Sequence, residues 1–477
     1  MHKRTLAVSL MLFVASGALA ETPSAQQMAE EMAAMRAQMA EQAAMLKAAQ
    51  AQIAALNAEK GETWMSDVRR EQVKQIVAEM MADADTRASL VGSGLYVGET
   101  GDGFTISNAE GTRLLKIGGQ LQFRYIYNTG DQDEDEDDID EHKSGFDFAR
   151  AKIGFDGQYD EMKYGVGLAL DPHSDDIRLE RAWVGVNLTD DLYVWGGRYK
   201  DRYLAEETVH SANQLAVERS LVNEVFTRGY VEGVAAEWMV NDNLRVGVSI
   251  DDGPRSGEDR TDEDEDEGPG LRFSDDRNDF AISSRIDWKV AGDWNQSWMP
   301  RYSASAQDYS FIGGGIHYQE GETGTESDNF SRLGYTIDAQ CKHSGVSLYG
   351  GFMGQHIDVE GTDDDYQIDQ HGVVAQAGVE IIPDRLDAFV RYEWADLDEG
   401  RFGDASNDEL SIVTIGTNYY PHVAGKLSLD FLYAFQPIPE ERDLGVPRGT
   451  LDQVGLMPDS GDEDGQFAIR AQYQLVF

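Results

Sequence analysis

The sequence predicts an all-β fold, a 16-stranded antiparallel transmembrane β-barrel, with an N-terminal α-helical coiled-coil segment. Three observations carry this prediction. The last strand-like run alternates apolar and polar residues, sixteen such runs follow residue 113, and the connections between the runs alternate between short and long. No later segment reaches the roughly 18 uninterrupted apolar residues that a membrane helix needs. Strands in a closed ring cross a membrane instead, because they pair every backbone N–H and C=O group.

Residues 1–20 have the pattern of a secretory signal peptide. His2–Arg4 supply a basic start, Leu6–Val14 form a short apolar run, and small residues at 18 and 20 mark a cleavage site. The mature chain is therefore expected to begin at Glu21 and to lie outside the cytoplasm.

Residues 21–60 are predicted to form a coiled coil in the periplasm. From Met28 to Leu56, a seam of residues steps by four and three over about four heptads, which is the a/d spacing. Met, Ala and the polar Gln42 make this seam weak by itself, and a single surface helix is the alternative. Residues 61–112 are expected to hold a second helix, Trp64–Ala82, and a glycine-rich linker before the barrel of 113–477.

Composition agrees with a barrel and excludes several functions. A single cysteine, Cys341, rules out an internal disulfide framework and a cysteine-based metal site. The 49 Gly, 8 Trp, 20 Tyr and 18 Phe suit twisted strands with aromatic girdles. A formal net charge of −47 excludes nucleic acid as a partner. The histidines show no metal spacing, and no G-x-S-x-G, H-E-x-x-H or P-loop motif occurs, so neither a cofactor nor enzymatic activity is expected.

Alternation is clearest in Leu427–Phe435 and in the last run, Gly465–Phe477. For the last run alone, a half-buried strand of a soluble sandwich is the alternative. Short turns such as 189–191 and 383–385 take every second connection, as in barrels with short periplasmic turns and long outer loops. The apolar faces are expected to point outward, around a water-filled lumen without a packed core. The predicted strands are 113–128, 145–158, 162–171, 177–188, 192–200, 227–240, 244–252, 278–290, 300–319, 329–342, 346–359, 371–382, 386–396, 408–419, 425–436 and 465–477.

Several segments resemble known membrane proteins. The final run, which ends on an aromatic residue, resembles the closing strand of bacterial outer-membrane barrels. Phe146–Gly154, FDFARAKIG, resembles the F-x-x-R-R-A-R strand of the phosphate-selective porin O and P family. Gly197–Lys200, followed by Glu206-Glu207 and Val217–Leu221, resembles the family's G-Q-F-K, E-E and E-R-S-L stretch, which continues to Arg228–Tyr230.

The resemblance implies a homotrimeric pore in the bacterial outer membrane, surrounded by lipid and permeable to small inorganic ions. It also implies that a third loop, Asp201–Phe226, folds inward and narrows the channel. Phosphate-specific members carry closely spaced arginines here, whereas this loop holds only Arg202 and Arg219. It also contains four acidic residues, Glu206, Glu207, Glu218 and Glu224. This departure weighs against strict phosphate specificity.

Basic side chains outnumber acidic ones on the predicted inner faces of the strands, and we expect them to set ion preference. The alternative is that these charges merely solvate the inner wall. The predicted function is passive diffusion of small hydrophilic solutes, with a preference for anions such as phosphate. A cation-preferring general-diffusion porin and an envelope tether or adhesin without a conducting pore are the competing hypotheses. The residues predicted to line the pore or its constriction are Lys116, Arg150, Lys152, Arg198, Lys200, Arg202, Arg219 and Arg228.

The acidic excess is concentrated in long connections. Asp131–Glu141 and Glu258–Glu267 are nearly pure acid, and both are expected on the outer side. Neither run has the spacing of a calcium-binding loop. Loose gathering of divalent cations or sodium by a solvated surface is therefore the predicted role of these loops.

Overall fold

The structure is a computed structural model that describes residues 95–100, 103–129, 142–171, 176–253, 280–296, 308–322, 329–360, 366–398, 408–422, 424–447, 449–458 and 465–477. The chain divides into two compact units, Met1–Ser89 and Leu90–Phe477, and the second is described below. The signal peptide (1–20), the coiled coil (21–60), the second helix (64–82) and the two acidic runs lie outside the described residues.

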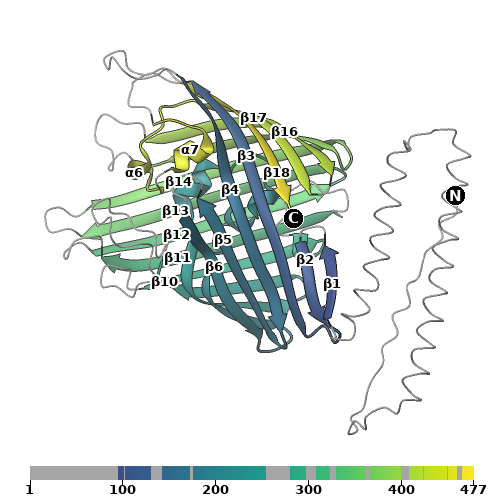
Figure 1. The fold of residues 1–477 in the computed structure, drawn as a ribbon. Coiled ribbons are helices and arrows are strands. Elements are labelled where there is room, and N and C mark those ends of the chain that lie inside the picture. Colours follow the sequence, from purple (N-terminus) through teal and green to yellow (C-terminus); the bar gives the residue numbers. More distant parts are fainter. Residues whose placement is uncertain are drawn as a thin grey trace, which may run out of the picture. The chain divides into compact units, whose positions relative to one another are not determined.

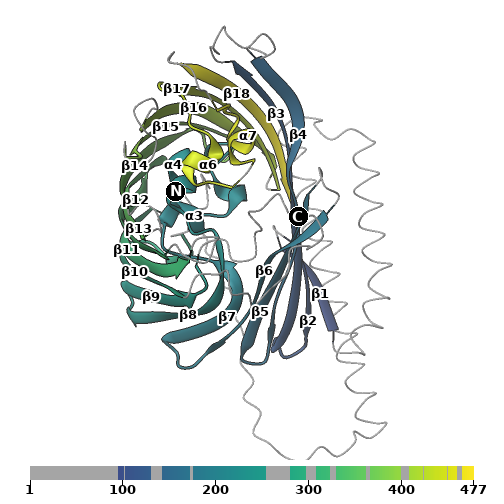
Figure 2. The same cartoon turned by 90° about the vertical axis from the view of Figure 1, so that its left-hand side faces the viewer.

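Sixteen antiparallel strands, β3 to β18, close into a ring (Figures 1 and 2). Each strand pairs with the next one along the chain, and β18 (Gln466–Val476) pairs with β3 (Arg113–Thr129) to complete the ring. The predicted sixteen-stranded barrel is thereby confirmed. The intervening strands are β4 (His142–Tyr159), β5 (Met162–Asp171), β6 (Asp176–Asn187), β7 (Leu192–Lys200), β8 (Tyr230–Asn241), β9 (Leu244–Asp251), β10 (Phe280–Ala291), β11 (Tyr309–Glu322), β12 (Asn329–His343), β13 (Val346–Glu360), β14 (Tyr366–Ile382), β15 (Leu386–Asp396), β16 (Glu409–His422) and β17 (Gly425–Ala434).

A β-hairpin precedes the ring, within residues that the sequence analysis assigned to a linker. β1 (Leu95–Thr100) pairs with β2 (Gly103–Asn108), and β2 pairs with the start of β3. Gly103 allows the close approach of β2 to β3, because a Cβ at this position would lie 2.5 Å from the carbonyl oxygen of Ile117. The glycines read as a linker therefore serve a strand pairing.

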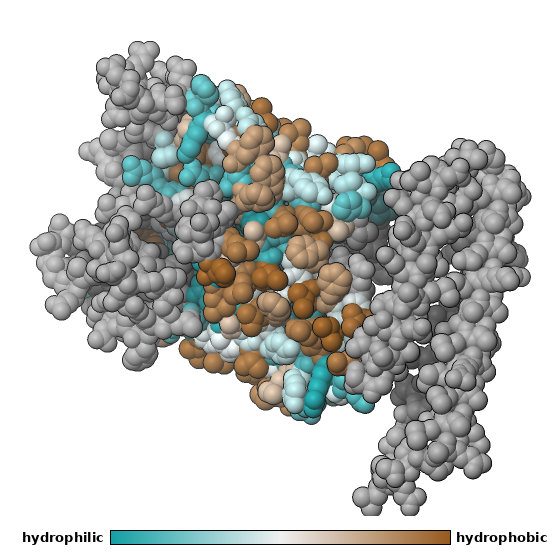
Figure 3. Space-filling view, viewed as in Figure 1, coloured by the Kyte–Doolittle hydropathy of each residue, from teal (hydrophilic) through white to brown (hydrophobic). Residues whose placement is uncertain are grey.

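The outer face of the barrel is apolar, and Figure 3 shows hydrophobic side chains across the strands. Val234, Ile250 and Ile282 form one row over β8, β9 and β10, and all three are exposed. In the adjacent row, Ser249 and Ser283 are buried on the inner face. This polarity is that of a barrel surrounded by lipid, with the apolar side outward. None of the helices in the described ranges has the length and apolarity of a membrane span.

One side of the barrel interior holds a dry core, which corrects the expectation of a lumen without packed apolar residues. The β7–β8 connection contributes α3 (Ala205–Thr208), η1 (Ser211–Asn213) and α4 (Leu221–Phe226), and the β17–β18 connection contributes α6 (Glu441–Leu444) and α7 (Thr450–Val454). The helices of both connections lie inside the ring (Figure 2). Their apolar side chains pack with inward-facing wall residues, including Met353, Val374, Leu410, Ile412, Leu432 and Ala434.

Gly197 allows the backbone of β7 to pass close to β6 before the chain enters the third loop. It has a φ of +123°, and a Cβ there would overlap the carbonyl oxygen of Ala182 on β6. We predict that Gly197→Ala lowers the free energy of unfolding by roughly 1 to 3 kcal/mol, since both the backbone conformation and the space exclude a side chain. Urea unfolding of the refolded barrel, followed on gels that separate folded from unfolded protein, measures the loss.

Gly350→Ala is the matched control. A Cβ at Gly350 meets no atom within 4 Å, so this variant should unfold within about 0.5 kcal/mol of the parent protein. Equal stability of the two variants would show that β7 does not depend on Gly197.

Candidate solute channel

A cavity of about 1320 Å³ extends along the barrel interior beside the third loop. Lys143, near the start of β4, lines it at the end of the barrel from which the third loop leaves. Tyr193, near the start of β7, lines it toward the opposite end. The cavity therefore follows the length of the wall formed by β4, β6 and β7. We call it the channel cavity.

Six of the eight predicted pore residues line the channel cavity: Arg150, Lys152, Arg198, Lys200, Arg202 and Arg219. The other two lie elsewhere. Lys116 pairs across the sheet with Asp156 near the start of β3. Arg228 is buried and donates hydrogen bonds to the carbonyl oxygen of Phe226 and to Gln355, both at 2.9 Å. The structure thus brings six of the eight predicted pore residues together at the channel cavity. The role of these residues in ion selection stays a prediction.

Sequence reasoning missed Glu180, Trp183 and His210 as members of this site, although all three line the cavity. A register shift between Gly167 and Leu168 of β5 places an extra residue in β6. The alternation of polar and apolar residues in the sequence does not reveal such a bulge, because the opposite set of residues faces inward beyond it. His210 lies in the third loop, where no periodicity reports which side chains face the channel.

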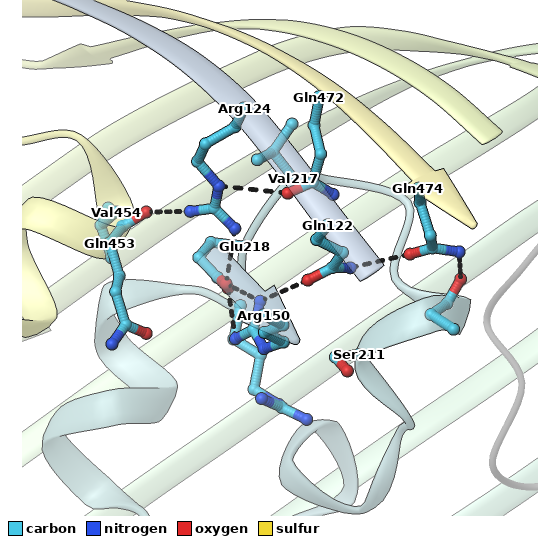
Figure 4. Close-up of polar contacts among 12 residues, drawn as sticks. Gln122, Arg124, Arg150, Ser211, Val217, Glu218, Gln453, Val454, Gln472 and Gln474 are labelled. Carbon is cyan, nitrogen blue, oxygen red and sulfur yellow. Dashed lines mark hydrogen bonds and ion pairs between the residues drawn. The ribbon is translucent and has the colours of Figure 1, made fainter. Parts of the chain in front are cut away.

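A buried ion cluster joins the third loop to the barrel wall (Figure 4). Glu218 of the loop accepts hydrogen bonds from Arg150 of β4, including one of 2.9 Å, and one of 3.2 Å from Arg124 of β3. Arg124 also donates to Gln472 at 3.1 Å and to the carbonyl oxygen of Gln453 at 2.6 Å. Burial by itself raises the pKa of Glu218, but Arg150 and Arg124 outweigh burial and hold the pKa well below its ordinary value.

Other carboxylates satisfy the backbone of the loop. Glu206 accepts hydrogen bonds from the N–H and the hydroxyl of Ser220, at 2.9 and 2.6 Å. Glu393 on β15 accepts from the N–H of Leu221 at 2.6 Å, and Arg391 donates to the carbonyl oxygen of Glu218 at 2.8 Å. Acidic residues that the sequence analysis weighed against phosphate binding therefore hold the loop in position.

Cations on the channel wall face carboxylates at short range. The pairs are Lys152 with Glu180, Lys200 with Glu207 at 2.5 Å, Arg198 with Glu232 at 3.1 Å, Arg181 with Asp156 at 2.8 Å and Arg202 with Glu237. Nine Lys or Arg and seven Asp or Glu residues line the cavity. The channel cavity therefore has a small basic excess in a chain whose formal net charge is −47.

The family model of phosphate-selective porin O and P matches residues 120–277, which include the wall strands β4 to β7 and the third loop. The predicted resemblance to this family is confirmed. No curated protein sequence gives a significant match. Together, the match to this porin family and the closed barrel support an outer-membrane channel.

The barrel is similar to solved protein structures at low sequence identity. An anion-selective porin from Comamonas acidovorans has a TM-score of 0.51 and 11% identity, covering 76% of this chain and 100% of that one. OprB of Pseudomonas putida has a TM-score of 0.50 and 11% identity, covering 83% and 97%. OmpT of Vibrio cholerae has a TM-score of 0.48 and 12% identity, covering 76% and 98%. At this level of identity, the first two likenesses establish the fold alone.

Glu218→Gln tests the buried ion cluster. The substitution leaves Arg124 and Arg150 without a compensating charge, and we expect a loss of roughly 3 to 5 kcal/mol in the free energy of unfolding. Asp452→Asn is the control, because it removes an exposed pair with Lys143 at 2.7 Å, and it should cost less than about 1 kcal/mol. Urea unfolding in lipid vesicles measures both. Equal losses would mean that Glu218 does not anchor the loop.

His210 supplies a pH test of the channel cavity. Enclosure within the barrel, followed by the charges of Lys152 and Lys200, lowers the pKa of His210 to about 4. A lowered pKa means that His210 is neutral at pH 7 and gains its charge only as the pH falls through that value. Parent protein and His210→Gln should therefore show equal anion-to-cation permeability ratios from pH 8 to 5. Below about pH 4 the parent should become the more anion-preferring of the two. Divergence near pH 6.5 would place His210 away from these cations.

Proposed function

We propose that this protein is a porin that passes small hydrophilic solutes through the channel cavity by passive diffusion, with a weak preference for anions such as phosphate. The observation that carries the proposal is a cavity along the barrel wall whose lining holds nine basic and seven acidic residues. Fixed charges in a narrow pore act on permeating ions more strongly than the same charges in open water. A small basic excess therefore favours anions.

The preference should be weak because the wall cations are paired. A permeating phosphate must compete with Glu207 for Lys200 and with Glu180 for Lys152. Unlike phosphate, those carboxylates are tethered beside the cations and do not have to be brought there from solution. Strong phosphate binding would need cations without such competitors. The proposed channel is therefore a general-diffusion porin rather than a phosphate-specific one, and the homotrimer stays a prediction.

The acidic connections favour the competing hypothesis of cation preference. The run 131–141 joins the ends of β3 and β4, and 258–267 joins β9 and β10, at the end of the barrel from which the third loop also leaves. Charges in open water act over about 30 Å in 0.01 M salt but about 3 Å in 1 M salt. The effect of these runs should therefore depend on ionic strength, whereas charges inside the channel are screened less.

We predict a weak anion preference in 1 M KCl that shrinks, or reverses toward cations, in 0.01 M KCl. Reversal potentials under a salt gradient in planar bilayers measure it. Replacing the acids of 131–141 with Asn and Gln, at constant loop length, should remove most of the salt dependence. Steady cation preference at 1 M KCl in the parent protein would favour the cation-preferring porin. A protein that inserts without any conductance would favour the tether.

A further inference from the structure

The inner wall of the channel cavity carries a row of aromatic side chains as well as cations. Tyr193 and Trp195 of β7 stack with ring centroids 5.4 Å apart, and the Trp195 and Tyr199 rings meet edge to face at 5.8 Å. Trp183 of β6 also packs against the cluster that contains Trp195 and Tyr199. All four residues line the channel cavity. A polar diffusion pore does not need such rings, since solvated side chains suffice for its inner wall.

Glycines on the same face make room for these side chains. Trp183 lies across from Gly165 on β5 and Gly197 on β7. A Cβ at Gly165 would lie 2.6 Å from Nε1 of Trp183, so the indole extends over the backbone of the neighbouring strand. Tyr193 extends over Gly185 in the same way. Trp195 and Tyr199 are buried. The partly buried rings of Trp183 and Tyr193 cover the wall where a solute moving along the channel cavity meets them.

A cation, Arg181, lies next to Trp183 on the wall of the channel cavity. Arg181 is two residues before Trp183 on the inner face of β6, and its side chain lies over Gly167 and is 33% exposed. Alternate residues on a strand are roughly 7 Å apart, a separation that an aromatic ring and its attached carboxylate can bridge. Asp156 holds the guanidinium at 2.8 Å, which leaves the remaining N–H groups of the fork for a second anion.

We propose that Trp183 and Arg181 form a binding site for aromatic carboxylates within the channel. This inference rests on the proposed porin function and names the class of solute that the channel retains. An inorganic anion gains only charge interactions, for which Asp156 already competes at Arg181. An aromatic carboxylate gains ring contact with Trp183 in addition, and aromatic pairs are favoured beyond the burial of their area.

Blocking of single-channel current tests the site. Benzoate, cyclohexanecarboxylate and inorganic phosphate are added in turn to channels carrying KCl current, and the half-blocking concentration of each is measured. Benzoate should block at a concentration roughly five-fold lower than cyclohexanecarboxylate, which has the same charge and no aromatic face. Equal half-blocking concentrations for the two acids, or tighter block by phosphate than by benzoate, would overturn the proposal.

Substitutions test whether Trp183 and Arg181 are the residues that bind benzoate. Trp183→Leu should abolish the difference between benzoate and cyclohexanecarboxylate, and Arg181→Gln should weaken block by both acids to a similar extent. Trp238→Leu is the matched control, because Trp238 is exposed on the outer face of β8, and it should retain the full difference. Loss of the difference in Trp238→Leu would overturn the assignment. Absence of KCl current in the parent protein would refute the porin function itself, whereas current without benzoate preference would refute only this site.

Discussion

The need to pair every strand edge is the constraint on which this structure depends. β18 returns to β3 and closes the ring, so no edge of the sixteen-stranded wall is left open to lipid. Closure leaves an interior too wide for wall side chains alone to fill. The chain fills part of that interior with two of its own connections, and the channel cavity is what remains. Wall and loops therefore determine the channel together.

The position of the third loop depends on charge. Glu218 binds Arg124 of β3 and Arg150 of β4, and Glu393 of β15 holds the start of α4. Burying such groups is costly unless each has a partner, so the pairs fix one arrangement of the loop. The dry core then seals the side of the interior next to β13–β17, and the channel cavity is left against β4, β6 and β7.

Period-two alternation predicted the strands well because one face of each strand meets lipid. β5, β7 and β15 have the predicted bounds. The hairpin 95–108 was missed because its glycines read as a linker, yet Gly103 allows close strand contact. Six predicted pore residues meet at the channel cavity. The dry core was missed because it depends on where the inserted loops lie, which no local periodicity records. Glu180, the partner of Lys152, was missed because a bulge changes which residues of β6 face inward.

The central claim is that solutes pass between the third loop and the β4–β7 wall, and not through the side filled by the dry core. Single cysteines in a Cys341→Ser background test it directly. His210→Cys lies on the channel cavity, whereas Ala434→Cys lies in the dry core. A sulfonated methanethiosulfonate reagent should cut the bilayer conductance of His210→Cys by at least about half, because it adds bulk and charge inside the channel cavity, and should leave Ala434→Cys unchanged. Block at position 434 with none at position 210 would contradict the account.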